Sequence, residues 1–321
     1  MILIKIKNLK GVIIINKIFQ KPATIFALVL ALSFQLVGCA KTEKDADTSS
    51  NVNPSPASTV KSETIIFGVA PGPYGDLVKY AIQPELEKKG YKVEFKQFSD
   101  YVQPNLALAN GEINANVFQH SRYLKKFCED KNLELSEVIK IPTAALGIYS
   151  KKVKAKNIEE LKKELKEGDT VTIANDPTNL ARALIFLRDL GLITIKGEID
   201  PTTASEKDID QNPYGLVIQP VEAAQLPRTL DSVTISVVNG NYAISAGIPL
   251  STAIAKEKLV EDTVNLIAVR TEDLDKQFVK DIKEIVESEF FRDQVESDKY
   301  EFKEFQRPEW YVKKWNIQNQ F

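Results

Sequence analysis

Beyond about residue 63, hydrophobic positions fall into two patterns: short β-branched runs, and stretches with apolar residues at helical spacing. Residues 64–70 form a nearly continuous apolar run, as in a strand buried on both faces. Helical spacing follows between Leu77 and Leu86, residues 91–95 alternate like a strand, and a second helix begins at Pro104. The order strand, helix, strand, helix predicts a parallel sheet with right-handed crossovers.

The same alternation restarts after residue 150 and predicts a second α/β unit. The expected elements are a helix from Asn157 to Gly168, a strand over 170–174, a helix over 180–190 and a strand over 233–238. A third block contains a strand over 264–269 and a helix from about 271 to 286. Periodicity alone does not assign this block to either unit.

The N-terminal segment has the features of an export signal. Five lysines and no acidic residue precede Cys39, and an apolar run covers residues 23–32. Residues 36–39, Leu-Val-Gly-Cys, resemble the bacterial lipoprotein cleavage box, which implies cleavage before Cys39 and a lipid on it. An uncleaved anchor helix is the alternative, although the run is short for a span of ~20 residues. We therefore expect a signal peptide over 1–38, then lipidated Cys39 and a flexible polar linker over 39–62.

Composition excludes several classes of function. Without the five leader lysines, 37 of the 42 basic residues remain against 44 acidic ones, so no nucleic acid is expected as a partner. His120 is the only histidine, and Cys128 is the only cysteine besides Cys39. These residues are too few for a typical structural zinc site, and with Cys39 acylated no internal disulfide can form. The sequence contains no P-loop, serine elbow or paired histidines. We predict a protein that is not an enzyme and uses no cofactor or metal.

Six stretches together resemble the methionine-binding lipoprotein family, the substrate-binding subunits of methionine ABC importers, and they follow the order found in that family. They are residues 68–73, 98–107, 111–120, 175–182, 225–230 and 238–243. The sequence departs from the family at Asn114, Ala181 and Tyr74, where aspartate, glycine and histidine are common. Residues 309–315 look unlike the family, so the role of residues 310–321 is unassigned.

The resemblance implies an α/β, two-lobed periplasmic-binding-protein fold of the type 2 solute-binding class, with the ligand in a cleft between the lobes. Lobe 1 is expected over 63–144 plus 243–321, and lobe 2 over 145–242. Hinge segments near 145–147 and 239–241 would let the lobes close around the ligand.

The same resemblance implies a lipid-anchored protein that binds methionine and delivers it to the permease and ATPase subunits of an ABC importer. Its place would be the cell envelope, anchored in a membrane by the N-terminal lipid and facing the periplasm or the cell exterior. L-methionine is the first candidate; D-methionine, a methionyl dipeptide or another small apolar amino acid are alternatives. A surface adhesin or structural lipoprotein of the same fold is a further alternative.

An amino-acid ligand needs counterparts for its carboxylate and its ammonium. We expect Arg182 to form a bidentate fork with the carboxylate, beside Asn179 at the start of a helix. Asn239 closes a buried strand, and we expect it to bond both charged groups of the ligand. Chemistry alone leaves other roles open: a surface ion pair for Arg182, a cap for Asn179 and a hinge turn for Asn239. For Asn241 we expect a turn.

Flat side chains are expected to hold the ligand's side chain. Tyr101, Phe118, His120 and Tyr123 lie close in the sequence, and a thioether gains about 0.3–1.5 kcal/mol against an aromatic ring. Plain core packing is the alternative for these rings. His120 lacks a partner nucleophile and metal co-ligands, so we predict a wall of the cleft, with a satisfied interior histidine as the alternative.

Overall fold

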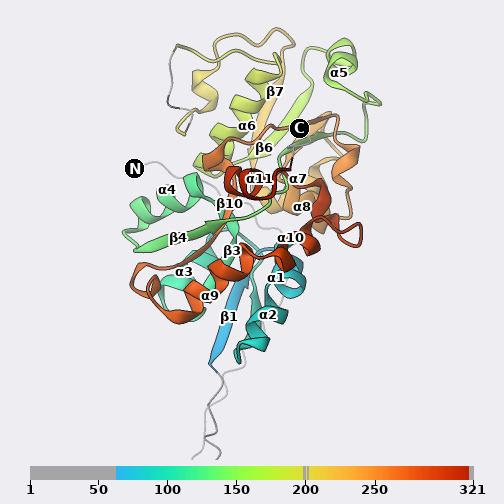
Figure 1. The fold of residues 1–321 in the computed structure, drawn as a ribbon. Helices are drawn as coiled ribbons and strands as arrows, with labels where there is room; N and C mark the ends of the chain where they lie inside the picture. Colours follow the sequence, from blue (N-terminus) through green and yellow to red (C-terminus); the bar gives the residue numbers. More distant parts are fainter. Residues whose placement is uncertain (1–62, 198–199, 201, 318–321) are drawn as a thin grey trace, which may run out of the picture. The chain divides into compact units, whose positions relative to one another are not determined.

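Two five-stranded sheets organise the part of the chain that this computed structural model describes, residues 63–197, 200 and 202–317 (Figure 1). All of these residues belong to one compact unit. Each sheet is the centre of one lobe, in agreement with the predicted two-lobed α/β fold. The predicted signal peptide, Cys39 and the linker up to residue 62 lie outside the described residues.

The first sheet has the strand order β2-β1-β3-β10-β4. Its strands are β1 Thr64–Val69, β2 Lys92–Gln97, β3 Ala115–His120, β4 Leu135–Lys140 and β10 Asn265–Arg270. β1 pairs in parallel with β2 and β3, as the alternation of strands and helices predicts. β10 runs antiparallel between β3 and β4, so the third block belongs to the first lobe, as the resemblance implied.

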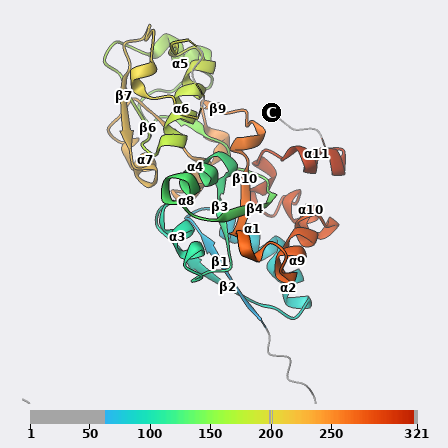
Figure 2. The same cartoon turned by 90° about the vertical axis from the view of Figure 1, so that its left-hand side faces the viewer.

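The helices that pack around this sheet come from both ends of the described chain (Figure 2). They are α1 Tyr74–Ala81, α2 Gln83–Lys88, α3 Gln103–Ala109, α4 Ser121–Lys131, α9 Gln277–Val286, α10 Glu289–Val295 and α11 Glu309–Trp315. The single helix expected around Leu77 and Leu86 is divided at Ile82, because Pro84 lacks an N–H and cannot continue the helical ladder. None of the described helices has the length and apolar character needed to cross a membrane.

The second sheet has the strand order β7-β6-β8-β5-β9. Its strands are β5 Gly147–Tyr149, β6 Thr170–Ala174, β7 Val217–Val221, β8 Ile235–Val238 and β9 Ala255–Lys256. β6 is parallel to β7 and β8, whereas β5 runs antiparallel between β8 and β9. Its helices are α5 Ile158–Glu164, α6 Pro177–Asp189, α7 Leu226–Thr229 and α8 Gly240–Ser245.

Strand pairing places the return from the second sheet to the first later than expected. The chain leaves the first sheet after β4 and enters the second at β5, through residues 141–146. It comes back only after β9, which pairs with β5 although the predicted limits put every residue beyond 242 in lobe 1. The limits implied by the resemblance therefore do not fit β9, which is hydrogen-bonded to β5 of the second sheet. The hinge role of the crossing segments stays a prediction.

Close packing fixes the first crossing against the start of α8. The Ala144 N–H donates to the Tyr74 hydroxyl at 3.1 Å, so the first lobe holds this crossing. A Cβ built on Gly240 would lie 2.6 Å from the carbonyl oxygen of Ala145 and 2.7 Å from the Cβ of Ala144. Only glycine lets the two segments approach this closely.

Gly240→Ala should therefore lower the free energy of unfolding by about 1–3 kcal/mol, because backbone atoms must move to admit the methyl group. Gly75→Ala is the matched control: it lies inside α1, its added Cβ would make an ordinary 3.5 Å contact with Val69, and it should be neutral or stabilising by up to about 1 kcal/mol. Chemical denaturation measures both. Equal effects of the two substitutions would contradict the proposed close packing.

Candidate ligand-binding site

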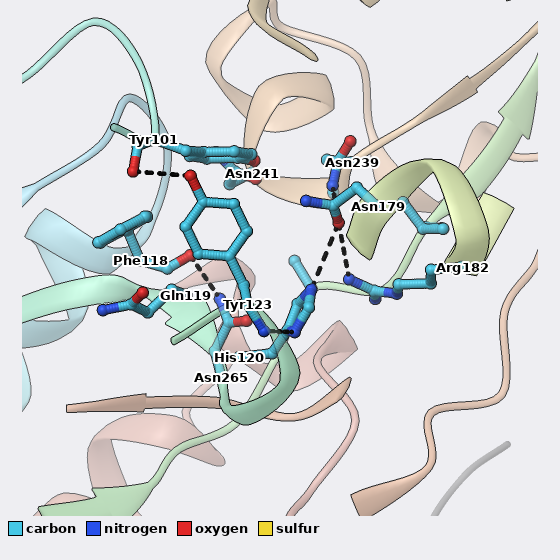
Figure 3. A pocket seen from close by; sticks show the side chains of 13 residues that line it. Tyr101, Phe118, Gln119, His120, Tyr123, Asn179, Arg182, Asn239, Asn241 and Asn265 are labelled. Carbon is cyan, nitrogen blue, oxygen red and sulfur yellow. Dashed lines mark hydrogen bonds between the residues drawn. The ribbon is translucent and has the colours of Figure 1, made fainter. Parts of the chain in front are cut away.

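A cavity brings together residues of both lobes (Figure 3). All seven side chains predicted to contact a ligand line it: Tyr101, Phe118, His120, Tyr123, Asn179, Arg182 and Asn239. Six residues that were not predicted complete the lining: Gln119, Ala144, Leu146, Gly240, Asn241 and Asn265. The structure thus gathers the whole predicted set, and the role of each residue toward a ligand stays a prediction.

Three aromatic rings form one side of the cavity. The ring of Tyr101 is stacked on Phe118 with centroids 5.7 Å apart, and Tyr123 presents its edge to both rings at 6.0 and 6.1 Å. The Tyr101 hydroxyl donates to Asn241 Oδ1 at 2.6 Å, and the Tyr123 hydroxyl donates to the carbonyl oxygen of Tyr101 at 3.1 Å. Because both hydroxyls are engaged, this side of the cavity suits an apolar or thioether group.

His120 stands between the rings and the polar side chains, where β3 ends and α4 begins. As the N-cap of α4 it accepts the Tyr123 N–H on Nδ1 at 3.0 Å, which leaves the proton of the neutral ring on Nε2. Burial lowers the pKa of His120 well below its usual range, and the charge of Arg182 lowers it further. His120 is therefore a neutral donor, with Nε2 directed at Asn179 Oδ1 3.4 Å away.

Both ring nitrogens of His120 are thus engaged away from Cys128. The thiol of Cys128 is free and half-buried, and burial raises its pKa. Within the described ranges, no group of three or more His, Cys, Asp or Glu side chains is arranged to hold a metal ion.

Asn179 Oδ1 is the meeting point of three hydrogen-bond donors. It receives His120 Nε2 at 3.4 Å, Arg182 Nη1 at 3.5 Å and Asn239 Nδ2 at 3.0 Å. The orientation of this amide is fixed by Asp176, the N-cap of α6, which accepts the backbone N–H and both bonds from Nδ2 at 3.0 Å. The amide nitrogen is held by the cap, so the oxygen faces the donors.

Asn239 leaves a polar atom without a partner. It follows β8, is 5% exposed, and donates through Nδ2 to Asn179. Its Oδ1 is buried and has no hydrogen-bond partner among the described residues. A buried acceptor without a partner costs about 1–3 kcal/mol, so this oxygen is suited to receive a donor from a ligand.

In this structure the guanidinium fork of Arg182 is directed at Glu257, and its predicted contact with a ligand carboxylate stays a prediction. Nε of Arg182 lies 2.8 and 3.0 Å from the two carboxylate oxygens of Glu257, and Nη2 lies 2.6 Å from Glu257 Oε2. Burial would lower the pKa of Arg182, but the charge and hydrogen bonds of Glu257 outweigh it and raise the pKa. Two of the three guanidinium nitrogens are thus occupied, and Nη1 faces Asn179.

Sequence reasoning missed several polar residues of the site, among them Glu257 and Asn241. Glu257 lies between Lys256 and Lys258, a pattern typical of an exposed segment, yet it is 8% exposed. Asn241 was expected to form a turn, but it is the second residue of α8, which begins at Gly240. Its side chain also joins two segments of the first lobe, accepting from Tyr101 and donating to the carbonyl oxygen of Pro71 at 2.9 Å. The one feature of the sequence that pointed to Asn241 was its position two residues after Asn239, within the family-like stretch 238–243.

The lowered pKa of His120 predicts a dependence of stability on pH. A histidine whose pKa is lower in the folded state than its usual 6.5 contributes stability above pH 6.5 that is lost as the pH falls below it. Between about pH 8 and pH 5.5, the wild type should lose about 1 kcal/mol more unfolding free energy than His120→Gln, which cannot titrate there. Asp176, whose pKa burial raises, acts in the opposite sense but equally in both proteins. Parallel denaturation curves for the two proteins across this range would contradict the prediction.

The known proteins to which this chain is similar belong to one group of lipoproteins. The family model described as NlpA lipoprotein matches residues 65–310. The D-methionine-binding lipoprotein MetQ of Escherichia coli K12 is 35% identical over 276 residues, which cover 84% of this chain and 92% of the relative. Outer membrane lipoprotein 3 of Mannheimia haemolytica is 38% identical over 230 residues, covering 71% and 85% of the two chains.

Solved structures agree with these matches. A nutrient binding protein from Burkholderia cenocepacia bound to methionine has 34% identity and a TM-score of 0.68, covering 75% of this chain and 97% of its own. The methionine binding protein MetQ has 34% identity and a TM-score of 0.67, covering 73% and 94%. These relatives are binding proteins and lipoproteins, which confirms the prediction that the chain is not an enzyme. The chain belongs to the NlpA lipoprotein family.

Proposed function

We propose that this protein is the lipid-anchored substrate-binding subunit of an ABC importer and that it captures methionine, with L-methionine as the first candidate. One observation carries the proposal: donors from His120, Arg182 and Asn239 converge on a single buried oxygen beside a set of aromatic rings. An α-amino acid with an apolar side chain requires this combination of a polar end and an apolar end.

The carboxylate of the ligand would take over the donors that now meet at Asn179. The amide oxygen Oδ1 occupies the position of an acceptor, with His120 Nε2, Arg182 Nη1 and Asn239 Nδ2 around it. A carboxylate is a stronger acceptor than an amide oxygen, and hydrogen bonds between charged groups are roughly twice as strong as neutral ones. The site therefore favours a ligand with a carboxylate over one with an amide.

The ammonium of the ligand would be received by acceptors on the same side. Asn239 Oδ1 has no partner among the described residues, and Asn179 Oδ1 is freed when its donors turn to the carboxylate. A single asparagine would then contact both charged groups of the ligand, as predicted from the sequence. This geometry suits an amino acid better than a simple carboxylic acid.

The side chain of the ligand would lie against the rings of Tyr101, Phe118 and Tyr123. Aromatic faces and edges suit a thioether, which supports methionine among the apolar amino acids. The names of the relatives support the same ligand, because two of the solved structures are described as bound to methionine or as methionine binding proteins. The stereochemistry is left to experiment, since the curated relatives are called D-methionine-binding.

Delivery to a transporter is the remaining part of the proposal. The sequence contains no P-loop, so ATP hydrolysis must come from a partner subunit. A lipid on Cys39 would hold the protein at a membrane of the cell envelope, facing the periplasm or the exterior, and the 39–62 segment would serve as its tether. Tethering raises the effective concentration of a binding protein at its transporter.

Calorimetry on the purified protein, unfolded and refolded to remove bound ligand, tests the proposal. We expect L-methionine to bind with a dissociation constant of about 1 µM or tighter, which corresponds to about −8 kcal/mol. D-methionine, methionyl dipeptides and other apolar amino acids form the comparison panel. Absence of heat with every member of the panel would refute amino-acid binding and favour an adhesin or structural role on the same fold.

Asn239→Leu provides a test at the level of one residue. It removes a donor and an acceptor that we assign to the ligand, so affinity for methionine should fall about 10- to 100-fold. The loss of folding stability should be small, because Oδ1 makes no hydrogen bond without ligand and Asn179 Oδ1 keeps the donors His120 and Arg182 when the bond from Nδ2 is removed.

The matched control for Asn239→Leu is Asn212→Ala. Asn212 holds the backbone N–H and carbonyl of Leu216 in the second lobe, away from the cavity. This variant should lose stability and keep its affinity for methionine. A loss of affinity in the control equal to that in Asn239→Leu would contradict the assignment.

A further inference from the structure

Arg182 is not an uncompensated positive charge in the wall of the cavity. Glu257 pairs with it at 2.6 Å, and both side chains are nearly inaccessible to solvent. Burial keeps His120 neutral by lowering its pKa, and the carboxylate of Asp176 lies behind Asn179, to which it is hydrogen-bonded. The Arg182–Glu257 pair as a whole carries no net charge, so the polar end of the cavity differs from a simple anion site.

Glu257 is itself held firmly by its surroundings. Its Oε2 accepts the backbone N–H of Leu146 at 3.3 Å, and its own N–H donates to the Leu146 carbonyl at 2.9 Å. Its carbonyl oxygen accepts a hydrogen bond from Gln306 Nε2. The other amide atom of Gln306, Oε1, accepts the N–H of Leu259 at 2.8 Å. Leu146 and Gln306 thus fix the backbone of Glu257, and the N–H of Leu146 and the guanidinium of Arg182 hold its carboxylate.

We propose that Glu257 is a positioning residue that sets the charge specificity of the cavity. It turns the guanidinium of Arg182 so that Nη1 faces the ligand, and it neutralises the arginine charge, so that the site selects a net-neutral zwitterion over an anion of the same shape. This inference rests on the proposed function, because it concerns how an amino acid is recognised.

The selection of a zwitterion follows from the electrostatic field at the polar end of the cavity. An arginine without Glu257 would attract any carboxylate and would repel the ligand's ammonium a few ångströms away. With Glu257 in place, the attraction for a lone carboxylate is reduced and the ammonium is tolerated. In partly buried sites such interactions amount to about tenfold or more in affinity.

Three ligands of nearly the same shape separate the attraction for the carboxylate from the repulsion of the ammonium. L-methionine is a zwitterion, its 2-hydroxy analogue 2-hydroxy-4-(methylthio)butanoate is an anion, and L-methioninol is a cation. The wild type should bind L-methionine at least about tenfold more tightly than either analogue. In Glu257→Gln the preference for methionine over the hydroxy analogue should shrink about tenfold, while methioninol should lose further affinity relative to methionine.

The opposite shifts of the two analogues distinguish a charge effect from a structural one. A carboxylate that served folding alone would weaken all three ligands by the same factor on substitution, and that result would overturn the proposal. Glu257→Asp keeps the charge and should retain the wild-type order of affinities. Asp281→Asn is the matched control, because it removes another buried carboxylate, which is paired with Lys89 and Tyr91 far from the cavity. It should leave the relative affinities of the three ligands unchanged.

A second variant covers the case in which Glu257→Gln does not fold. Arg182→Gln combined with Glu257→Gln removes both charges, a change that buried pairs often tolerate. The preference for methionine over the hydroxy analogue should then stay within about threefold of the wild type, and its loss would overturn the proposal. The titration of the wild type separates failure of the proposed function from failure of the role of Glu257. If the wild type does not bind methionine, the proposed function fails. If it binds methionine and Glu257→Gln keeps the same ratio of affinities for methionine and the hydroxy analogue, only the role of Glu257 is refuted.

Discussion

The buried ion pair between Arg182 and Glu257 is the interaction on which the arrangement of the cavity depends. A guanidinium that is 5% exposed beside aromatic rings is tolerated only with a partner, since breaking a buried pair costs about 3–5 kcal/mol. The partner comes from the segment that leaves the second sheet, and the same carboxylate receives the N–H of Leu146 in the first crossing. One residue therefore joins α6, both crossings and, through Gln306, the C-terminal segment. The polar end of the cavity is built where these segments meet.

The other side chains of the site depend on how elements begin and end. His120 caps α4, and Asp176 caps α6 while holding the amide of Asn179. These caps satisfy helix termini and at the same time decide which atom faces the cavity. The hydrogen bond from Tyr123 leaves His120 with its proton on Nε2, and the bonds to Asp176 turn Asn179 Oδ1 toward the donors. The residues that cap these helices thus also orient the polar atoms that face the cavity.

The sequence predicted the parts of this structure that carry local signals. β1, β6 and β8 are β-branched runs, and the caps of α5 and α6 lie at turn residues, so pattern and chemistry agree there. β3 was not predicted as a strand, because Asn116 and Gln119 interrupt its apolar pattern. Both amides are nevertheless buried and bonded to each other and to Asn105, 11 and 14 residues away. Glu257 was missed for the same reason, since its partner Arg182 lies 75 residues earlier. Burial of a polar side chain depends on a partner that single-sequence patterns do not reveal.

A crystal structure of the protein with L-selenomethionine would test the proposed binding mode, because the anomalous signal of selenium locates the ligand's side chain independently of the protein density. We expect selenium among the rings of Tyr101, Phe118 and Tyr123. The carboxylate should lie within hydrogen-bond distance of His120 Nε2 and Arg182 Nη1, with Glu257 still paired to Arg182. Selenium outside the ring cluster would contradict the proposed binding mode. So would a ligand carboxylate that occupies Nε and Nη2 of Arg182 after displacing Glu257.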